Sequence, residues 1–264
     1  VIYDRGLTEQ EIKDSYLVGS RRELWFYDNL KFHLKFDQIL NDVTFDEIVG
    51  LSGTCVNVTE SVGYKDGAFT FDGTSSIDFG ENYDFLQSLG NTDFTIMFWM
   101  KENDVRTDSM RYFQNCNVGN PIGKQGLQIA SRVDGDYLGF SNTYLALASG
   151  ANSNFSNFSY GENDGNWHHI CFRWIRDKAW FELFIDGVWK ERAINTDTYS
   201  LQTGDFTSSF STTIGKSNSN EQWLKGLLDE MMIFDIALTG NQIEDSYKNL
   251  NFTHYKLHGD VTQD

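Results

Sequence analysis

The sequence NWHHICFRWIRDKAWFELFIDGVW, from Asn166 to Trp189, decides the fold class. Folding it about a turn at residues 176–179 brings apolar residues opposite one another: Ile170 with Ile185, Phe172 with Leu183, and Trp174 with Phe181. The residues between them pair on the other face: His169 with Asp186, Cys171 with Phe184, and Arg173 with Glu182. Because side chains alternate faces along a strand, this register buries one apolar face and leaves two opposite-charge pairs outside. The stretch therefore predicts an antiparallel hairpin at the centre of a β-sandwich.

Working outward from this hairpin, short alternating segments punctuated by Gly, Asn and Asp predict further strands. They are Phe32–Asp37, Cys55–Val58, Ala68–Phe71, Ser76–Phe79, Phe94–Lys101, Leu127–Ser131, Tyr137–Phe140, Thr212–Gly215 and Gly226–Phe234. Leu127–Ser131 and Tyr137–Phe140 are expected to form a hairpin, and two polar stretches, 102–124 and 149–164, are expected to be loops. Together with a short C-terminal helix, these elements predict an all-β, two-sheet antiparallel jelly-roll sandwich.

Composition excludes some partners. The 264 residues carry a net charge of −17, which disfavours nucleic acid and anionic membrane surfaces, because phosphate contacts need clustered Lys and Arg. No apolar run of about eighteen residues is present, so membrane insertion is not expected. Acidic loops suit divalent cations, although acidity also serves solubility alone. Cys171 is expected to be a small buried hydrophobe, and a Cys55–Cys116 disulfide stays open.

The two ends of the chain carry a repeat. VIYDRGLTEQEIKDSY (residues 1–16) and MIFDIALTGNQIEDSY (residues 232–247) share Ile, Asp, Leu, Thr, Ile, Asp, Ser and Tyr without a gap. Each copy predicts a short strand, a turn and a helix with capping-box spacing. Residues 252–257 resemble residues 32–36 less closely. The simplest organisation is a tandem array: residues 1–23 close a preceding module, 24–250 form one complete module, and 251–264 open the next or serve as a linker.

Seven motifs in order carry a resemblance to a known family. They are LKFD at 34, GAFTFDGTSSIDF at 67, DFTIMFWMK at 93, NWHHICFRW at 166, LFIDGV at 183, TTIGKS at 212 and GLLDEMMIFDIALTGNQIEDSY at 226. Over nearly all of residues 34–247 the chain resembles the concanavalin A-like, laminin-G-like jelly-roll domains. The resemblance implies two curved sheets, a calcium ion at the sandwich rim in many members, and glycan or protein binding by rim loops. It does not identify a ligand, because the fold hosts many functions.

The family's structural calcium site, carried over, points to Asp37, the backbone carbonyl of Gly73, and Asp229. Carboxylate and carbonyl oxygens together suit a hard cation, which would stabilise the module rather than bind ligand. The alternative is that Asp72 beside this glycine only fixes a turn, and that Asp229 only caps a strand end.

Catalysis is not expected. Glycosidases of this fold use two carboxylates about 5 Å apart. Of the nearest pairs, Glu182 with Asp186 is better explained by partners Arg173 and His169, while Asp229 and Glu230 point to opposite faces. His168 and His169 also face opposite ways and cannot share one ion, so both are expected to bond within the sheet.

Sugar recognition needs aromatic platforms beside planar polar groups. The best supply lies mostly in the predicted 149–164 loop, and the selected residues are Tyr144, Asn154, Phe155, Asn157, Phe158, Tyr160 and Trp223. Each aromatic could instead pin a loop to the sandwich.

Two functions follow from these features. The first is a calcium-supported, lectin-like adhesion module in a tandem array, exposed at a cell or virion surface, that binds a glycan or surface protein. Its four Asn-x-Ser/Thr sequons add weak support for secretion. The alternative is a structural module of a fibre or virion that acts through protein–protein packing.

Overall fold

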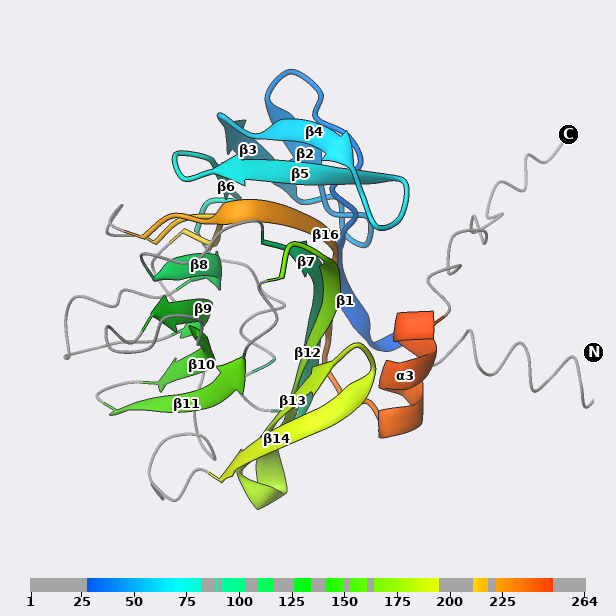
Figure 1. Cartoon of the computed structure of the whole chain (residues 1–264), viewed down its shortest axis with the longest axis vertical. Coiled ribbons are helices and arrows are strands. Elements are labelled where there is room, and N and C mark those ends of the chain that lie inside the picture. Colours follow the sequence, from blue (N-terminus) through cyan, green and yellow to red (C-terminus); the bar gives the residue numbers. More distant parts are fainter. Residues whose placement is uncertain are drawn as a thin grey trace, which may run out of the picture.

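The computed structural model describes residues 28–81, 89, 92–102, 109–115, 126–133, 141–149, 152–160, 164–194, 211–217 and 222–248. For residues 126, 132, 133, 141–149, 152–160, 193 and 194 it describes the backbone alone. Within these ranges the chain forms two antiparallel sheets packed face to face, with a helix on the outside of one of them (Figure 1). The predicted jelly-roll sandwich is confirmed.

Sheet A contains β1, β4, β5, β7, β12, β13, β14 and β16, and sheet B contains the other eight strands. In spatial order, sheet A runs β14 (Val188–Ile194), β13 (Trp180–Ile185), β12 (Trp167–Ile175), β7 (Phe94–Lys101), β16 (Lys225–Phe234), β5 (Gly67–Asp72) and β4 (Thr59–Val62), with β1 (Leu30–Leu34) also paired to β16. Sheet B runs β11 (Asn152–Tyr160), β10 (Ser141–Ser149), β9 (Gly126–Val133), β8 (Met110–Gln114), β15 (Thr213–Ile214), β6 (Ser76–Asp78), β3 (Ser52–Val56) and β2 (Val43–Phe45).

The hairpin that decided the fold class has the predicted register. In β12 and β13, Ile170 pairs with Ile185, Phe172 with Leu183, and Trp174 with Phe181. A short 3₁₀ turn, Arg176–Lys178, joins the two strands, and Ala179 closes it in the left-handed conformation at φ 51°. The pairing of Arg173 with Glu182 is also confirmed.

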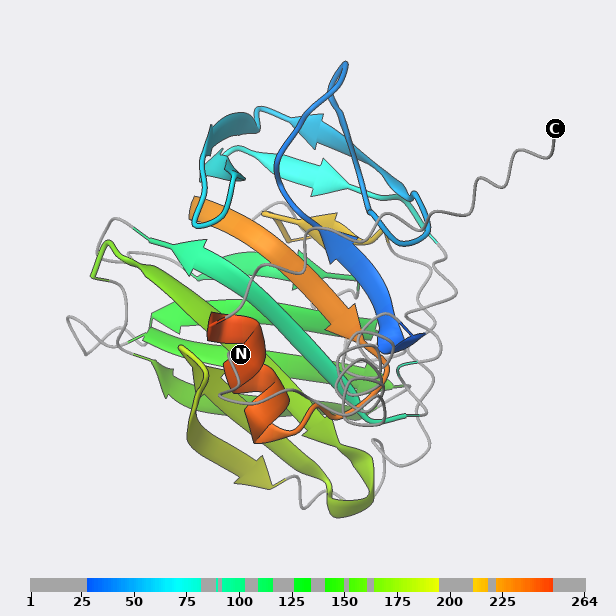
Figure 2. The same ribbon diagram turned by 90° about the vertical axis from the view of Figure 1, so that its right-hand side faces the viewer.

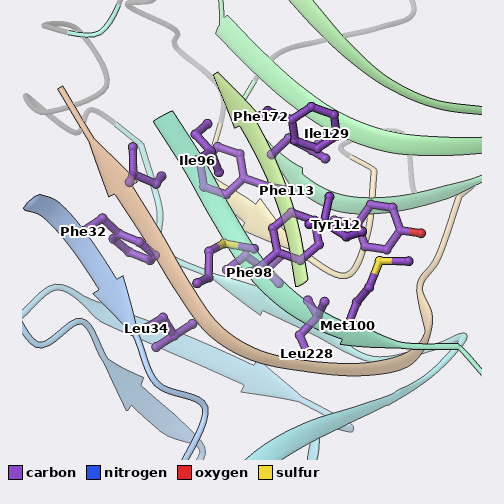
Figure 3. Close-up of a cluster of buried hydrophobic side chains, with 14 of the residues drawn as sticks. Phe32, Leu34, Ile96, Phe98, Met100, Tyr112, Phe113, Ile129, Phe172 and Leu228 are labelled. Atoms are coloured by element: carbon purple, nitrogen blue, oxygen red, sulfur yellow. The ribbon is translucent and has the colours of Figure 1, made fainter. Parts of the chain in front are cut away.

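The main core lies between the two sheets (Figure 3). Phe94, Ile96, Phe98 and Met100 of β7 point into it, as the alternation predicts, and meet side chains such as Phe113 from sheet B. These residues are at most 2% exposed. A fully buried Phe or Trp is worth about 3–5 kcal/mol relative to alanine, so this layer carries much of the folding free energy.

The outer face of sheet A forms a second buried layer, which the hairpin pattern did not predict. Trp99, Cys171 and Phe184 belong to a separate apolar cluster on that face. Helix α3 (Gly240–Lys248) lies across it (Figure 2). The residues expected to point outward from the hairpin are therefore covered, and Cys171 is a buried free thiol as expected.

Helix α3 starts at the predicted capping box. The Thr239 backbone N–H donates to Gln242 Oε1 at 2.7 Å, and the Gln242 N–H donates to Thr239 Oγ1 at 3.3 Å. Leu238 and Ile243 are fully buried beneath the helix. The helix therefore packs back onto the sandwich as its spacing predicted.

Two predicted loops are wrong, because each contains a strand. The 102–124 stretch includes β8, whose residues Met110–Gln114 are all buried, and the 149–164 stretch includes β11. Strand β11 has the sequence NSNFSNFSY, which looks like a loop, but it lies at the edge of sheet B and pairs with β10 along its whole length, which satisfies the backbone groups that face β10. Strand β9 pairs with residues 141–149; the predicted strand Tyr137–Phe140 lies outside the described residues.

The terminal segments 1–23 and 251–264, like Cys116, lie outside the described residues. Cys55 is a buried free thiol. No helix in the described ranges is both long enough and apolar enough to cross a bilayer.

Candidate functional site

Asp229 is the most unusual of the predicted cation ligands. It lies in β16, where a bulge shifts the pairing with β7 and the next residue, Glu230, takes a left-handed φ of 50°. Its side chain is fully buried. Its Oδ2 accepts the Lys65 backbone N–H at 2.9 Å, whereas its Oδ1 has no hydrogen-bond partner among the residues that the structure describes. Burial, reinforced by the neighbouring carboxylates of Glu230 and Asp37, raises the pKa of Asp229 to about 8.

Asp37 lies close to Asp229, just beyond the end of β1. Its Oδ1 accepts the Gly67 backbone N–H at 2.8 Å, at the start of β5. Burial raises the pKa of Asp37, and repulsion from Glu230 adds to this effect despite the Gly67 hydrogen bond. Two of the three predicted ligands are thus brought together at the turn between β4 and β5.

Glu230 behaves differently from Asp229, although the two residues are adjacent. The His33 Nε2–H donates to Glu230 Oε2 at 2.5 Å, and Lys65 Nζ lies 3.4 Å from Oε1. Burial works against ionisation, but these two partners outweigh it and hold the pKa of Glu230 below its usual value. The bulge therefore gives one carboxylate its countercharges, while the other has none within the described part of the chain.

Gly73 is not part of this group. It follows the far end of β5, and six residues of extended strand separate it from Gly67 by about 20 Å. Its N–H donates to the Leu224 carbonyl at 2.9 Å, and its φ of 92° favours glycine. Asp72 beside it accepts hydrogen bonds from Thr74 and Ser75, the turn-fixing role kept as an alternative.

A cation would find part of a coordination shell between Asp37 and Asp229. The unpartnered Oδ1 of Asp229 and the raised pKa values of both carboxylates fit a hard cation. Among the described residues, no three His, Cys, Asp or Glu side chains are grouped to hold a metal. Backbone carbonyls or water would have to complete the shell.

The predicted sugar-binding residues lie mainly on two paired strands rather than on a loop. Tyr144 of β10 stands opposite Asn157 of β11, and also opposite Ala130 of β9. Ile129, next along β9, points into the core. Because positions alternate along a strand, Tyr144, Phe155 and Asn157 hold positions on the outward face of sheet B.

The other members of that set hold different positions. Asn154, Phe158 and Tyr160 are at the alternate, core-facing positions of β11. Trp223 forms an isolated bridge with Lys216 next to β15, which is three strands away from β10 and so about 14 Å across the sheet. The structure therefore divides the predicted surface, and only Tyr144, Phe155 and Asn157 remain together.

A buried polar row on the outer face of sheet A was not predicted from the sequence. His169 of β12 and Asp229 of β16 both pair in register with Trp99 of β7, so the three form one row across the outer face of sheet A. Each is at most 1% exposed and has a polar side-chain atom with no partner in the described ranges: Trp99 Nε1, both nitrogens of His169, and Asp229 Oδ1. Tyr64 stacks on Trp99 with ring centroids 3.4 Å apart. The pairing registers of β7 with β12 and with β16 identify this row, but the second register depends on the bulge in β16.

The family of the chain is shown by its match to known proteins. A laminin G-type family model, described as the concanavalin A-like lectin/glucanases superfamily, matches residues 71–244. The chain belongs to this superfamily. No match was found among curated protein sequences.

Solved structures share this superfamily fold. The binding domain of botulinum neurotoxin serotype D matches with TM-score 0.59 and 14% sequence identity. The match covers 84% of this chain and 52% of the neurotoxin domain. The receptor binding domain of the botulinum neurotoxin C/D mosaic serotype gives TM-score 0.60 and 15% identity, and the match covers 84% of this chain and 52% of that domain. Domain 4 of AbnA, a GH43 extracellular arabinanase from Geobacillus stearothermophilus in complex with arabinotriose, gives TM-score 0.54 and 21% identity, covering 82% and 98%. The chain spans about half the length of the neurotoxin domains that it matches.

In a superfamily that includes glucanases, the first carboxylate pair considered for catalysis is Glu182 with Asp186. Glu182 is buried and bound by two guanidinium groups, with Arg173 Nε 2.7 Å from Oε2 and Arg192 Nε 2.8 Å from Oε1. Asp186 instead contacts His168 and the backbone of His169. Each carboxylate of this pair is thus committed to the scaffold. The predicted pairing of His169 with Asp186 is confirmed through the backbone, because the His169 N–H donates to Asp186 Oδ1 and the Asp186 N–H donates to the His169 carbonyl, both at 2.9 Å. The His169 ring itself has no hydrogen-bond partner among the described residues.

His168 joins two segments of this superfamily sandwich. Its Nδ1 lies 2.9 Å from Asp186 Oδ2, and its Nε2 lies 3.1 Å from Asp164 Oδ1. Partial burial lowers the pKa of His168, but the two carboxylates outweigh burial and raise it above its usual value. His168 therefore bonds to Asp186, at the end of β13, as expected for bonding within the sheet, and also to Asp164, in the segment before β12.

We expect His168→Asn to remove a pH-dependent part of the stability. Because the folded-state pKa is raised, the His168 contribution is complete below the unfolded pKa of about 6.5 and is lost as pH rises through the folded value. The variant should lose about 1 kcal/mol at pH 5.5 and less at pH 8.5, measured by urea unfolding. A loss that grows with pH would contradict this assignment.

Proposed function

We propose that the chain is a non-catalytic, glycan-binding module of a protein displayed outside the cell or on a cell or virion surface. The observation that carries the proposal is membership of a lectin and glucanase superfamily with Glu182 and Asp186, one of the two carboxylate pairs considered for catalysis, committed to the scaffold. The arabinanase domain solved with arabinotriose, which matches over 98% of its length, supports a carbohydrate ligand. The neurotoxin receptor-binding domains support glycans or surface proteins as partners.

The proposed ligand surface is the outward face of β10 and β11. Tyr144 and Phe155 supply aromatic positions, and Asn157, in register with Tyr144, supplies an amide. An aromatic ring stacks on the C–H face of a sugar while an amide reads its hydroxyls. Of the seven residues predicted to bind sugar, these three are the ones that the strand register places together on the outward face.

A glycan array followed by titration calorimetry tests this function. We expect binding to at least one glycan class, with a Kd in the micromolar to millimolar range, and a loss of about tenfold or more in Tyr144→Ala and Asn157→Ala. Asn154→Ala is the matched control, since it makes the same change at a core-facing position and should change the Kd less than about twofold. No binding to any glycan, or equal losses in both asparagine variants, would overturn the proposal.

We further propose that Ca²⁺ binds between Asp37 and Asp229 and stabilises the module. An ion that binds only the folded state raises stability by RT ln(1 + [L]/Kd), about 2.7 kcal/mol at 100 times the Kd. The melting temperature should then rise by about 5–10 °C on adding Ca²⁺ after chelation, and Asp229→Asn should abolish the rise. Equal stabilisation of the variant would exclude this site.

A structural module acting by packing is the second candidate function. The second copy of the closing sequence at residues 1–16 favours it, because such a segment completes a sandwich. It becomes the better account if the glycan array is negative.

A further inference from the structure

Residues 232–247, here called the closing segment, complete the sandwich. They comprise the end of β16, a connecting loop and most of α3. Ile233 lies in the core between the sheets, and the loop is anchored twice. The Leu238 N–H donates to Thr95 Oγ1 at 2.9 Å, and Arg173 Nη1 donates to the Leu238 carbonyl at 2.6 Å. Helix α3 then packs Ile243 and Tyr247 over the outer face of sheet A.

The copy at residues 1–16 preserves what this role requires. Leu238, Ile243 and Ser246 are the buried residues between 235 and 248, and all three are identical in the copy, as Leu7, Ile12 and Ser15. The cap residue Thr239 and the stacking residue Tyr247 are also identical.

Two of the differences lie at exposed positions at the start of the helix. Gly240 and Asn241 are exposed, and they become Glu9 and Gln10 in the copy. A Cβ atom added to Gly240 would meet no other described atom within 4 Å, so glutamate fits there without a clash. In the loop and helix every buried residue is thus identical, whereas in the strand part buried Met232 and Phe234 become Val1 and Tyr3, both of which still suit a strand, and half-buried Ile236 becomes Arg5. Identity at the buried helix positions is the pattern expected of a shared packing role.

The place that such a segment needs is already filled in this chain. Strand β16 pairs with β1, β5 and β7, and α3 covers the outer face beside it (Figure 2). Residues 1–16, which lie outside the described residues, therefore cannot occupy the same place on the same module. We propose that residues 1–16 are a second closing segment, which completes sheet A of another module of this type. This inference goes beyond glycan binding and does not depend on it.

The binding surface on that partner follows from the contacts of α3. It is an outer sheet face lined by aromatic and sulfur side chains, as Met97, Trp99 and Phe184 line it here. The strand at the start of the segment would add main-chain hydrogen bonds to the partner's counterparts of β1 and β7, which is the β-augmentation mode of recognition.

A segment exchange in the full chain tests the inference. In one variant, residues 232–247 carry the sequence of residues 1–16; in the control, the same variant also carries Ala at the positions of Leu238 and Ile243. We expect the exchange to keep one cooperative thermal transition, with a melting temperature about 5–10 °C lower, because buried Phe234 becomes Tyr. The control should lose that transition. An exchange variant that unfolds like the control would overturn the inference.

Deletion of residues 1–23 tests it without disturbing the core. We expect the melting temperature to change by less than about 2 °C, because the segment serves another module. A fall as large as that of the control variant would show that the segment closes its own module, and the proposal would be wrong. Glycan binding by the deletion variant is measured separately, so failure of the ligand proposal cannot be mistaken for failure of this one.

Discussion

Glu182→Gln is expected to cost about 3–5 kcal/mol of unfolding free energy, which corresponds to a melting temperature lowered by about 10 °C. The Glu182 carboxylate is 1% exposed and lies between the guanidinium groups of Arg173 and Arg192. Arg192 also lies 3.6 Å above the Trp180 ring. Removing the shared anion leaves two partly buried cations facing each other, which costs more than one lost hydrogen bond.

The stability that Glu182 contributes should fall as the pH is lowered. Burial opposes ionisation of Glu182, but Arg192 and Arg173 outweigh it and hold its pKa below the usual value. Its contribution is therefore present above the unfolded pKa of about 4.5 and is lost as pH falls through the folded value. Glu47→Gln is the matched control, since Glu47 forms an exposed pair with Lys35 and should change stability by less than about 1 kcal/mol. Equal losses in the two variants, measured by urea unfolding at pH 7, would contradict a special role for Glu182.

Asp229→Asn is expected to have the opposite effect and to stabilise the chain in the absence of divalent cations. The pKa of Asp229 is about 8 in the folded chain, compared with 3.8 for an unperturbed aspartate. The folded state then holds a proton that the unfolded state releases, so stability falls as pH rises from about 4 to about 8. The gain from the neutral amide should be near zero at pH 4 and on the order of 3–5 kcal/mol at pH 9.

Two measurements separate this effect from a general change in packing. Unfolding is followed from pH 4 to pH 9 in a chelating buffer, with Asp177→Asn, at an exposed position, as the control that should stay level. Saturating Ca²⁺ is then added, and the advantage of the variant should shrink or reverse, because the proposed Ca²⁺ site requires the carboxylate. A pH-independent difference would show that the buried charge is not its cause.

The sequence predicted the parts of the fold that depend on alternation. The β12–β13 register, the two faces of β7 and the capping box of α3 all follow from spacing within one or two segments. It failed at β8 and β11, where composition suggested loops: β8 is held by pairing with β9 and β15, and β11 by pairing with β10, and the polar composition of these stretches does not show those partners.

The candidate site was predicted less completely. Asp37 and Asp229, which were selected together, lie close to each other, and Gly73 was placed with them by analogy, although β5 separates it from both. The polar row of His169, Trp99 and Asp229 was missed because a one-residue bulge decides which face Asp229 occupies. A bulge at this position leaves no mark in the local sequence pattern.

What the sequence determined by itself is therefore the sandwich and the register of its central hairpin, since each depends on periodicity along one stretch of chain, together with the sequence repeat between residues 1–16 and 232–247. Only the tertiary structure decided which carboxylate keeps its countercharges, which histidine ring is buried without a hydrogen-bond partner among the described residues, and which aromatics share a face. Those properties depend on desolvation and on contacts between strands far apart in the chain, and neither is encoded in the spacing of any single segment.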